Sequence, residues 1–514
     1  MLQLKRVKLK SCSINLGELC NLNDFGFFHP FFHCITENGH EFVARMRLHV
    51  TEPLNKLIFV DPRYFPDGGF VVNSSGSPVL NRCDSFSNTS NSPNKVLRPD
   101  ILRNVLLYEI SDNEIKKSLL DGYNFQSECI SYQSDHANDI QIAFTCHDPN
   151  IIGGGNIILF RFINWLSDLG VKAIVYSCGS LPTWTRVCAK FRIFGSYQEM
   201  FDAINESIVI LFSVWHIEPI LKTNPTGKKI YHLRQIVENY HYGTDYHSMM
   251  IRKPVLDLLE SLPIGVITVS PHLRHWYKNE LGIDSLLIPN GIDLGIFFPS
   301  QTKKKPAKNI WKIASVGDPV HFVKGVDVLA QALLLLAKRR PNLHLEWHLA
   351  FGQARSFDMG LCNLKNLQIF PHVGLKHIQM RQFYQDADLY VNHSLYEGFG
   401  LPTLEAMACG IPVIQADNRG LDFIVKDGCN CLLVPINDPP KLSDAIEKII
   451  SDEKLANQFK AQGILTAKKY SIRQQFSYFI DVFEKNILNT SFPKEKISNI
   501  YNKIDTFRHL NRIK

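Results

Sequence analysis

The feature that most constrains the fold is a rhythm of short apolar, β-branched runs alternating with helical segments, which begins near residue 140. Each run is bounded by turn formers, as expected of strands buried on both faces of a parallel sheet. A chain that alternates strand and helix in this order forms βαβ units. The runs that we interpret as strands of a first unit are 140–146, 171–177, 207–214, 228–233 and 263–270.

The same rhythm starts again after the charged stretch SQTKKKPAKN at 300–309. Because 514 residues are too many for one hydrophobic core, two such sets predict two doubly wound, Rossmann-like α/β domains in series. We place the first domain at 139–285 and the second at 286–469. The strands expected in the second domain are 310–316, 343–350, 366–370, 388–393, 411–415 and 431–434.

The two ends of the chain depart from this pattern. Residues 1–138 mix aromatic apolar segments with stretches rich in turn formers, which predicts an extra, β-rich domain with a flexible segment near 83–98. Residues 470–490 predict a helix that packs back across both domains, and 491–514 a basic tail. The chain carries a net charge of +7, and its basic excess lies toward this end. Such a tail suits anionic lipid head groups, although a solvated helical face is the other interpretation.

The segment LYEGFGLPTLEAM at 395–407 points most directly to a ligand. It follows an expected strand and runs into a helix that Pro402 opens and Gly410 closes. Free backbone N–H groups and the helix dipole make such a glycine-rich entry an anion site. The backbone predicted to bind a phosphate group is that of Gly398, Phe399, Gly400 and Leu401.

Two glutamates flank this loop. Glu405, in the first helical turn, would repel a phosphate and is therefore expected to accept hydrogen bonds from ribose hydroxyl groups. Glu397 lies on the other side of the phosphate, where a transferred sugar would be placed. The order fits a nucleotide, a diphosphate and a sugar, whereas the alternative is that the glycines only turn the chain and the carboxylates are solvated.

The stretch SLYEGFGLPTLEAMACGIPVI resembles the Glu–seven residues–Glu signature of retaining family-4 (group 1) glycosyltransferases, which have the GT-B fold. Other segments are similar to that family in the expected order, and together they cover about 140–485. They are GGGNIILFRFINWLSDLG (153–170), TVSPHLRHWY (268–277), PNGID (289–293) and VGDPVHFVKGVDVLAQAL (316–333).

The resemblance implies a role for each matching residue of the second domain. Lys324 would contact the donor diphosphate, and Gly317 would belong to the same site. Glu405 would hold the ribose and Glu397 the donor sugar. The family usually has an arginine after the glycine at 317, but this chain has Asp318. Another cation would have to replace that arginine, or the loop would be rearranged.

The resemblance also implies residues of the first domain. Gly154 and Gly155 would line the cleft, and His216 would lie near the reacting sugar. A histidine that follows a strand is as often structural, so that alternative stays open for His216. The pair Asp386 and Asp388 looks like a metal-binding Asp-x-Asp motif, but Asp386 precedes a buried strand, and we expect no metal site and no cofactor.

The function implied is transfer of a hexosyl or deoxyhexosyl group from a nucleotide-diphosphate sugar to a glycan or lipid-linked acceptor hydroxyl, with retention of configuration and without a metal. Gln235 and Glu238 resemble a segment of rhamnan-type and O-antigen transferases, which favours polysaccharide or glycoconjugate biosynthesis. We expect a cytoplasmic protein, with peripheral contact at the inner face of the membrane through its tail as one option, and no nucleic-acid partner. The alternatives are a catalytically degenerate GT-B protein that binds sugar nucleotides or glycans, and a GT-B sugar-nucleotide epimerase.

Overall fold

The computed structural model describes the chain in two ways. Strands within residues 4–108 are described by their backbone. Backbone and side chains are then described for residues 140–223, 225–237, 256, 259–301, 310–319, 321–352 and 364–505, except for the side chain of Phe322, and helical backbone continues to Ile513.

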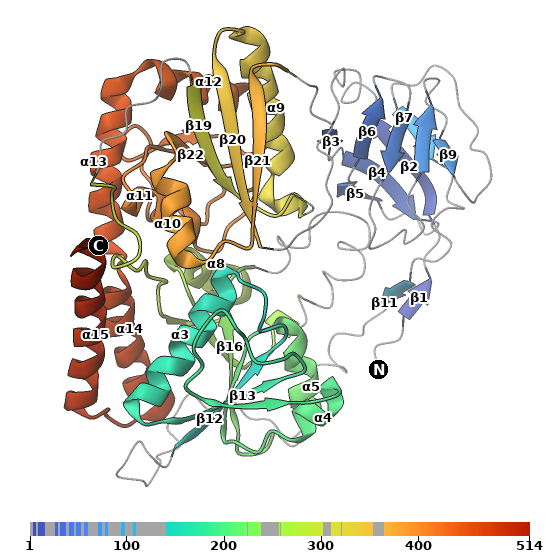
Figure 1. Ribbon diagram of the computed structural model, residues 1–514. Coiled ribbons are helices and arrows are strands. Elements are labelled where there is room, and N and C mark those ends of the chain that lie inside the picture. Colours follow the sequence, from blue (N-terminus) through green and yellow to red (C-terminus); the bar gives the residue numbers. More distant parts are fainter. Residues whose placement is uncertain are drawn as a thin grey trace.

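The N-terminal strands form antiparallel sheets, drawn in blue in Figure 1. One sheet has the order β10-β2-β4-β5, a second has the order β3-β6-β7-β8-β9, and β1 pairs with β11. This strand content agrees with the expected β-rich region. The segment near 83–98, predicted to be flexible, lies outside the described residues except for β10. The bounds are β1 Leu4–Arg6, β2 Leu9–Asn15, β3 Gly26–Phe28, β4 Phe31–Thr36, β5 Glu41–Arg45, β6 Leu48–Glu52, β7 Lys56–Phe59, β8 Phe70–Asn73, β9 Pro78–Leu80, β10 Asn94–Leu97 and β11 Leu106–Tyr108.

The first α/β domain is built on a parallel sheet with the order β14-β13-β12-β15-β16-β17-β18. Its central strands are buried on both faces, as their apolar, β-branched sequences require. The strands are β12 Gln141–Cys146, β13 Lys172–Ser177, β14 Lys190–Ile193, β15 Ile208–Leu211, β16 Lys229–Arg234, β17 Gly265–Thr268 and β18 Leu286–Leu287. The helices are α3 Gly154–Leu169, α4 Tyr197–Asp202, η3 Val214–His216, α5 Ile217–Lys222 and α8 Pro271–Leu281.

The second α/β domain has a parallel sheet with the order β21-β20-β19-β22-β23-β24. All six strands expected from the sequence are present. They are β19 Ile310–Val316, β20 His344–Phe351, β21 Leu367–Val373, β22 Leu389–Asn392, β23 Val413–Ala416 and β24 Leu432–Val434. The helices are η5 Phe322–Lys324, α9 Val326–Arg339, α10 His377–Gln385, α11 Leu401–Ala408, α12 Pro439–Ser451 and α13 Glu453–Lys469.

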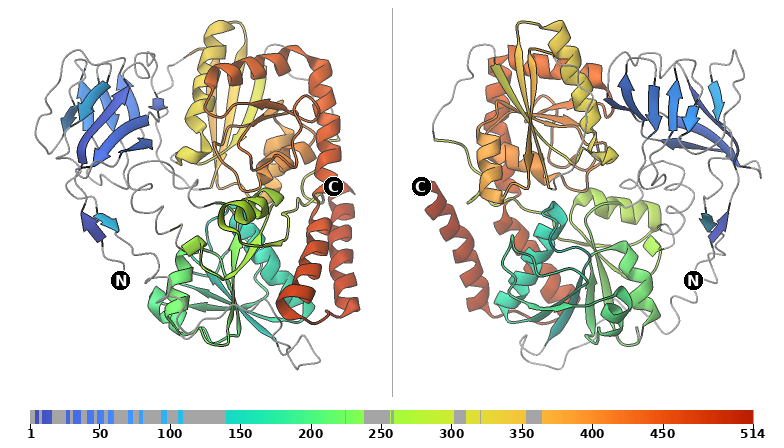
Figure 2. Two further views of the ribbon diagram at one scale, coloured as in Figure 1. Left: turned by 180° about the vertical axis from the view of Figure 1, so that it is seen from behind. Right: turned by 45° about the vertical axis from the view of Figure 1, so that its right-hand side comes forward.

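The helix expected at 470–490 is present as α14 (Ile472–Val482), continued by the π-helical turn η6 (Phe483–Leu488). It leaves the second domain and packs on α3 of the first through aromatic rings, and the red C-terminal helices lie beside the teal α3 in Figure 2. The ring centroids of Phe476 and Trp165 are 4.9 Å apart, and those of Phe479 and Phe162 are 5.1 Å apart.

The basic tail expected at 491–514 is a helix over most of its length, α15 (Lys494–Ile513). Its apolar residues Ile500 and Ile504 are buried, which explains why this segment packs back on the molecule. An ion pair of 3.2 Å between Lys503 Nζ and Asp168 Oδ2 ties α15 to α3. Within the part of the chain that the structure describes, no helix is both long and apolar enough to span a lipid bilayer.

Candidate functional site

The loops that follow the carboxyl ends of the two parallel sheets meet each other, between the lower and upper domains of Figure 1. A Cβ atom placed on Gly154, at the start of α3, would lie 3.4 Å from the side chain of Leu401, at the start of α11. A Cβ atom on Gly352 would lie 3.4 Å from the carbonyl oxygen of Ile152. Ligands of open α/β sheets bind at this end of the strands, so the meeting loops form the candidate site.

The loop between β22 and α11 occupies the middle of this region. Gly400 has a φ of 74°, the left-handed conformation that lets the chain turn into the helix at Leu401. In this structure, no side-chain hydrogen bond caps the N-terminus of α11. The first turn therefore leaves the positive end of a helix dipole available to an anion. Binding of a phosphate group by residues 398–401 stays a prediction.

Gly398 and Phe399 are buried within this loop. A Cβ atom on Gly398 would lie 1.9 Å from the carbonyl oxygen of Gln235 in the first domain. The need for glycine at this position therefore arises from contact between the two domains. That Gly398 also allows the backbone to approach a phosphate stays a prediction.

A buried polar network supports the loop from below, and sequence analysis missed it. The amide of Asn392 donates to Thr403 Oγ1 at 3.1 Å, and Thr403 Oγ1 donates to Gln415 Oε1 at 2.8 Å. The amide of Asn418 donates to the carbonyl oxygen of Ser394 at 3.1 Å. Buried polar groups that satisfy one another in this way hold a loop in one conformation. The only signals in the sequence were Asn392, at the end of buried β22, and Asn418, just beyond the end of buried β23.

Lys324 and Glu397, far apart in the chain, are brought together. Lys324 Nζ donates to Glu397 Oε1 at 2.8 Å, and both side chains stay partly exposed. The buried imidazole of His393 donates through Nδ1 to the carbonyl oxygen of Lys324. Burial lowers the pKa of His393 to about 4, so this imidazole is neutral at physiological pH. A Cβ atom on Gly317 would lie 3.1 Å from that of Lys324, so all four residues belong to one cluster.

Glu405 lies on the other side of the loop in a drier environment. Burial raises the pKa of its carboxyl group to about 7, although a hydrogen bond from Tyr384 and the charge of Arg161 favour the carboxylate. The Tyr384 hydroxyl donates to Glu405 Oε2 at 2.8 Å. This carboxyl group changes charge near neutral pH, and as a carboxylate it accepts hydrogen bonds from hydroxyl groups.

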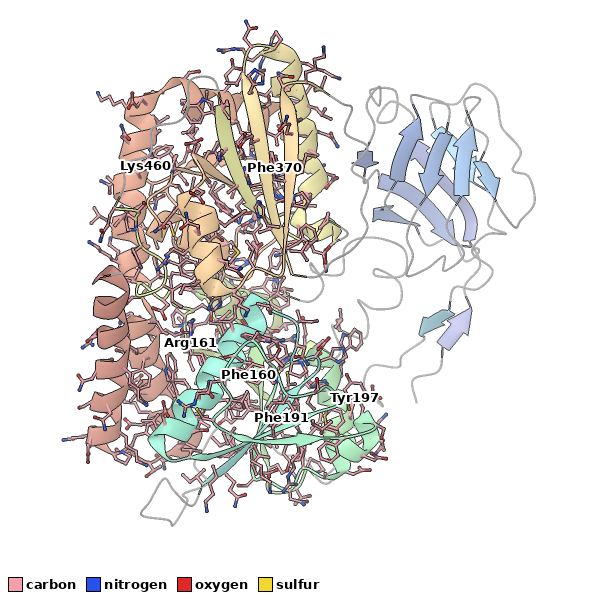
Figure 3. The ribbon with its side chains drawn as sticks, viewed as in Figure 1. Phe160, Arg161, Phe191, Tyr197, Phe370 and Lys460 are labelled. Carbon is pink, nitrogen blue, oxygen red and sulfur yellow. The ribbon has the colours of Figure 1, made fainter. Side chains whose placement is uncertain are left out.

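Arg161, labelled in Figure 3, lies on α3 where the domains meet. Its Nη1 atom donates to the carbonyl oxygen of Gly291 at 2.9 Å and to Gln475 Oε1 at 2.6 Å. The guanidinium therefore joins α3 to the interdomain connection and to α14, and it places a positive charge behind Glu405. Sequence analysis did not identify Arg161, because its partners lie 130 and 314 residues further along the chain.

His216 is enclosed in the first domain, with 3% of its surface exposed. Its Nδ1 atom lies 2.8 Å from Thr145 Oγ1. Burial, helped by the charge of His147, lowers the pKa of His216 to about 3. An exposed histidine at this edge is His147, whose ring stacks on that of Tyr197 with centroids 5.6 Å apart. Tyr197 is labelled in Figure 3. Contact between His216 and a sugar stays a prediction, and His147 is a neighbour that sequence analysis missed.

The remaining predicted positions fall as follows. A Cβ atom on Gly155 would lie 3.1 Å from the ring of Phe212, so this glycine permits close packing below the site. Asp318 lies in the loop after β19, where its carbonyl oxygen accepts from His321 N. Asp388 accepts from Lys312 N at 2.9 Å. Gln235 is described, whereas Glu238 lies outside the described residues.

Two doubly wound domains whose strand ends face each other define the GT-B class, and solved structures share this fold. Sucrose-phosphate synthase from Thermosynechococcus elongatus matches with a TM-score of 0.54 and 17% identity, over 67% of this chain and 98% of that chain. WaaG, a glycosyltransferase of lipopolysaccharide biosynthesis, matches with a TM-score of 0.52 and 14% identity, over 67% and 99%. These matches confirm the predicted GT-B fold.

Sequence comparisons match part of the chain to one family. Residues 299–466 match the model described as glycosyl transferases group 1. D-inositol 3-phosphate glycosyltransferase of Paenarthrobacter aurescens is 31% identical over 222 residues, which is 40% of this chain and 53% of that protein. Phosphatidyl-myo-inositol mannosyltransferase of Mycobacterium tuberculosis is 27% identical over 259 residues, 48% and 67% respectively. Poly(glycerol-phosphate) alpha-glucosyltransferase of Bacillus subtilis is 26% identical over 49% of this chain and 38% of that protein.

The chain spans about half the length of the first of these relatives. Its residues 299–466 match the group 1 glycosyltransferase model and lie within a GT-B fold, in agreement with the family that the sequence resembled.

Proposed function

We propose that this protein transfers a sugar from a nucleotide-diphosphate donor to a hydroxyl group of a glycan or lipid-linked acceptor, with retention of configuration. The observation that carries the proposal is the order of groups along one loop. Glu405 lies at one end, the open N-terminus of α11 follows, and the Lys324–Glu397 pair lies at the other end. That order matches the three parts of a nucleotide sugar.

In this proposal the groups act on the charge of the leaving diphosphate. Negative charge grows on the diphosphate as the glycosidic bond to it breaks, and the ammonium group of Lys324 and the first turn of α11 stabilise that charge. Glu397 orients the sugar and holds Lys324 in place through their 2.8 Å hydrogen bond. The Glu405 carboxylate accepts hydrogen bonds from the ribose.

The close fit of the domains supplies a second requirement of transfer, the exclusion of water. The backbone of Gly398 meets that of Gln235, and the Val237 amide donates to the Tyr396 hydroxyl at 3.4 Å. Contacts of this kind close the donor loop against the first domain. A closed arrangement favours transfer to the acceptor over hydrolysis of the donor.

The comparisons support a nucleotide-sugar donor and a glycoconjugate acceptor, but they do not identify the donor or acceptor of this chain. The Anabaena protein HepE has this fold, with a TM-score of 0.50 at 14% identity, and its structure was solved in complex with UDP-glucose. The relatives are named for D-inositol 3-phosphate, phosphatidyl-myo-inositol and poly(glycerol-phosphate), and a further relative, from Rhizobium meliloti, is named for lipopolysaccharide core biosynthesis. A role in glycoconjugate or polysaccharide biosynthesis, including the rhamnan and O-antigen types, is part of the proposal.

We also propose that the reaction needs no metal ion, because the ammonium group of Lys324 and a helix N-terminus take the part that a cation would play. The proposed location is the cytoplasm, with contact to anionic lipid through the exposed basic residues of α13 and α15. Lys454, Lys468, Lys469 and Lys494 are among these exposed residues. Co-sedimentation with vesicles of anionic or neutral lipid tests this contact, and equal recovery with both would exclude it.

The experiment that tests the function is a panel of UDP-, GDP-, ADP- and dTDP-linked sugars incubated with the purified full-length protein, with and without EDTA. Release of nucleotide from one donor that EDTA does not change, and that is lost in Glu405→Gln, is the expected result. Release that EDTA abolishes would refute the metal-independent mechanism.

A second candidate, a catalytically degenerate binder of sugar nucleotides, is favoured by Asp318, an acid where the family usually has an arginine. Binding of a donor with no turnover on any acceptor would support that candidate. Conversion of a free sugar nucleotide without an acceptor would instead indicate an epimerase.

A further inference from the structure

The backbone of Arg419 is in an unusual conformation. Among the described residues, three other than glycine have a positive φ: Arg419 at 61°, Asn437 at 57° and Asn489 at 53°. Asparagine adopts this left-handed region readily, because its short polar side chain can hydrogen-bond locally. A long arginine side chain gains no such compensation. Strained residues of this kind persist where the surroundings require them, and they cluster at ligand sites.

The loop that carries Arg419 is fixed against the loop that carries Glu397. A Cβ atom on Gly420 would lie 1.8 Å from the carbonyl oxygen of Glu397, so the two backbones are in direct contact. On the other side of Arg419, the amide of buried Asn418 donates to the carbonyl oxygen of Ser394 at 3.1 Å. The two neighbours of Arg419 therefore hold its backbone beside the proposed donor site, while its own side chain stays exposed.

The charge of Arg419 acts on groups where the two domains meet. His272 belongs to the first turn of α8 in the first domain, and its pKa is lowered mainly by burial and further by the charge of Arg419. Burial and the nearby Asp417 raise the pKa of Asp422, while His272 and Arg419 oppose that rise. Arg419 is thus the cationic member of a small group of charges where the two domains meet.

The charge balance of the proposed site requires a further cation. Lys324 already has a carboxylate partner, Glu397, at 2.8 Å. The residue that follows Gly317 is Asp318, an acid. A diphosphate that leaves with its bond electrons gains negative charge. Lys324, already paired with Glu397, balances that charge poorly. Arginine suits this task, because its planar fork donates two parallel hydrogen bonds to a phosphate group.

Building on the proposed function, we propose that Arg419 binds the diphosphate of the donor beside Glu397. The contact between Gly420 and the Glu397 carbonyl oxygen places Arg419 beside the 397–401 loop. Arg419 would then be a substrate-binding residue supplied by the loop after β23, in addition to Lys324 from the loop after β19.

The test compares variants that remove or keep the positive charge of Arg419 and that relieve its left-handed backbone. Arg419→Gly removes the guanidinium and relieves the backbone, Arg419→Lys keeps a positive charge, and Lys426→Ala removes an exposed cation from the same segment as a control. Calorimetry would measure the affinity of each full-length protein for the nucleoside diphosphate that wild type binds and for the corresponding nucleoside. Thermal unfolding would be recorded in parallel.

We expect Arg419→Gly to unfold at a higher temperature than wild type and to bind the diphosphate at least about tenfold more weakly, because a hydrogen bond to a charged group is lost. Nucleoside affinity should not change, Arg419→Lys should recover part of the loss, and Lys426→Ala should bind as wild type does.

Unchanged diphosphate affinity in Arg419→Gly would overturn the inference and leave the proposed function intact. Reduced turnover with unchanged diphosphate affinity would also overturn it, by moving the contact to the acceptor. Wild-type protein that binds none of UDP, GDP, ADP and dTDP would refute the proposed function, and the inference with it.

Discussion

The pKa of Glu405 makes a quantitative prediction about how nucleotide binding depends on pH. Burial raises that pKa to about 7, and the ribose hydroxyl groups need the carboxylate as an acceptor. Protonation below pH ~7 therefore competes with the ligand. The affinity for a nucleotide sugar should be constant above pH ~8 and should fall about tenfold for each pH unit well below ~7.

The substitution Glu405→Gln keeps the shape and removes the charge. At pH 8 it should weaken binding by roughly ten- to a hundredfold, because a hydrogen bond to a charged group contributes about 1.5–3 kcal/mol. Its affinity should also lose the dependence on pH, because the amide does not titrate in this range. The two effects together distinguish loss of a carboxylate from general damage to the site.

The assay is calorimetric titration of the full-length protein with a nucleotide sugar between pH 5.5 and 8.5. A nucleotide sugar is preferred to a free nucleoside diphosphate, whose terminal phosphate gains a proton in the same range. Lys426→Ala, at an exposed site, serves as the matched control. Wild-type affinity that does not vary with pH, or an equal slope in Glu405→Gln, would refute the assignment of Glu405 to the ribose.

Further predictions concern the rest of the site and the core. Lys324→Ala should lower kcat more than it lowers nucleotide affinity, and unchanged turnover would show that Lys324 does not act on the leaving group. Gly398→Ala places a methyl group 1.9 Å from the Gln235 carbonyl oxygen and should prevent the domains from closing. Turnover should be lost, free-nucleotide affinity should stay within a few-fold, and small-angle scattering should show separated domains. Normal turnover would contradict a closure contact. Trp165→Ala removes the ring between α3 and α14 and should destabilise the protein by about 3–5 kcal/mol in chemical denaturation, whereas a change below about 1 kcal/mol would mean that this contact is dispensable. At pH 8, Glu405→Gln should unfold at a higher temperature than wild type, because a carboxyl pKa raised from 4.5 to about 7 destabilises the folded state as pH rises above ~4.5, with the full effect above ~7. The difference should vanish below pH ~4.5, and a constant difference would refute the pKa.

Sequence patterns predicted the buried parallel strands well, because strands covered on both faces are apolar along their whole length. They missed β14, with the sequence KFRI, and the two-residue β18, since neither is a continuous apolar run. The last helix, α15, was expected as a basic tail because its lysines and arginines obscure the few apolar positions that pack on the molecule.

The site was predictable where its parts are close in sequence and hidden where the fold joins distant segments. Glu397 and Glu405 share one loop-and-helix motif, so their relation could be inferred from spacing. Tyr384 and Arg161, which set the environment of Glu405, come from α10 and α3. No local pattern connects those helices, and burial of the carboxyl group is a property of the packed structure alone.

The connection between the domains has a mechanical consequence. The chain crosses from the first domain to the second near Ile292 and returns near Tyr470, and these two crossings are bonded to each other. Ile292 N donates to the Tyr470 carbonyl oxygen at 2.7 Å, and Ile472 N donates to that of Ile292 at 2.8 Å. Two crossings bonded side by side form a single hinge. We therefore expect the domains to rotate about one axis and to resist sliding or twisting. Each opening of the molecule would then return Glu397 and Glu405 to the same place opposite the first domain.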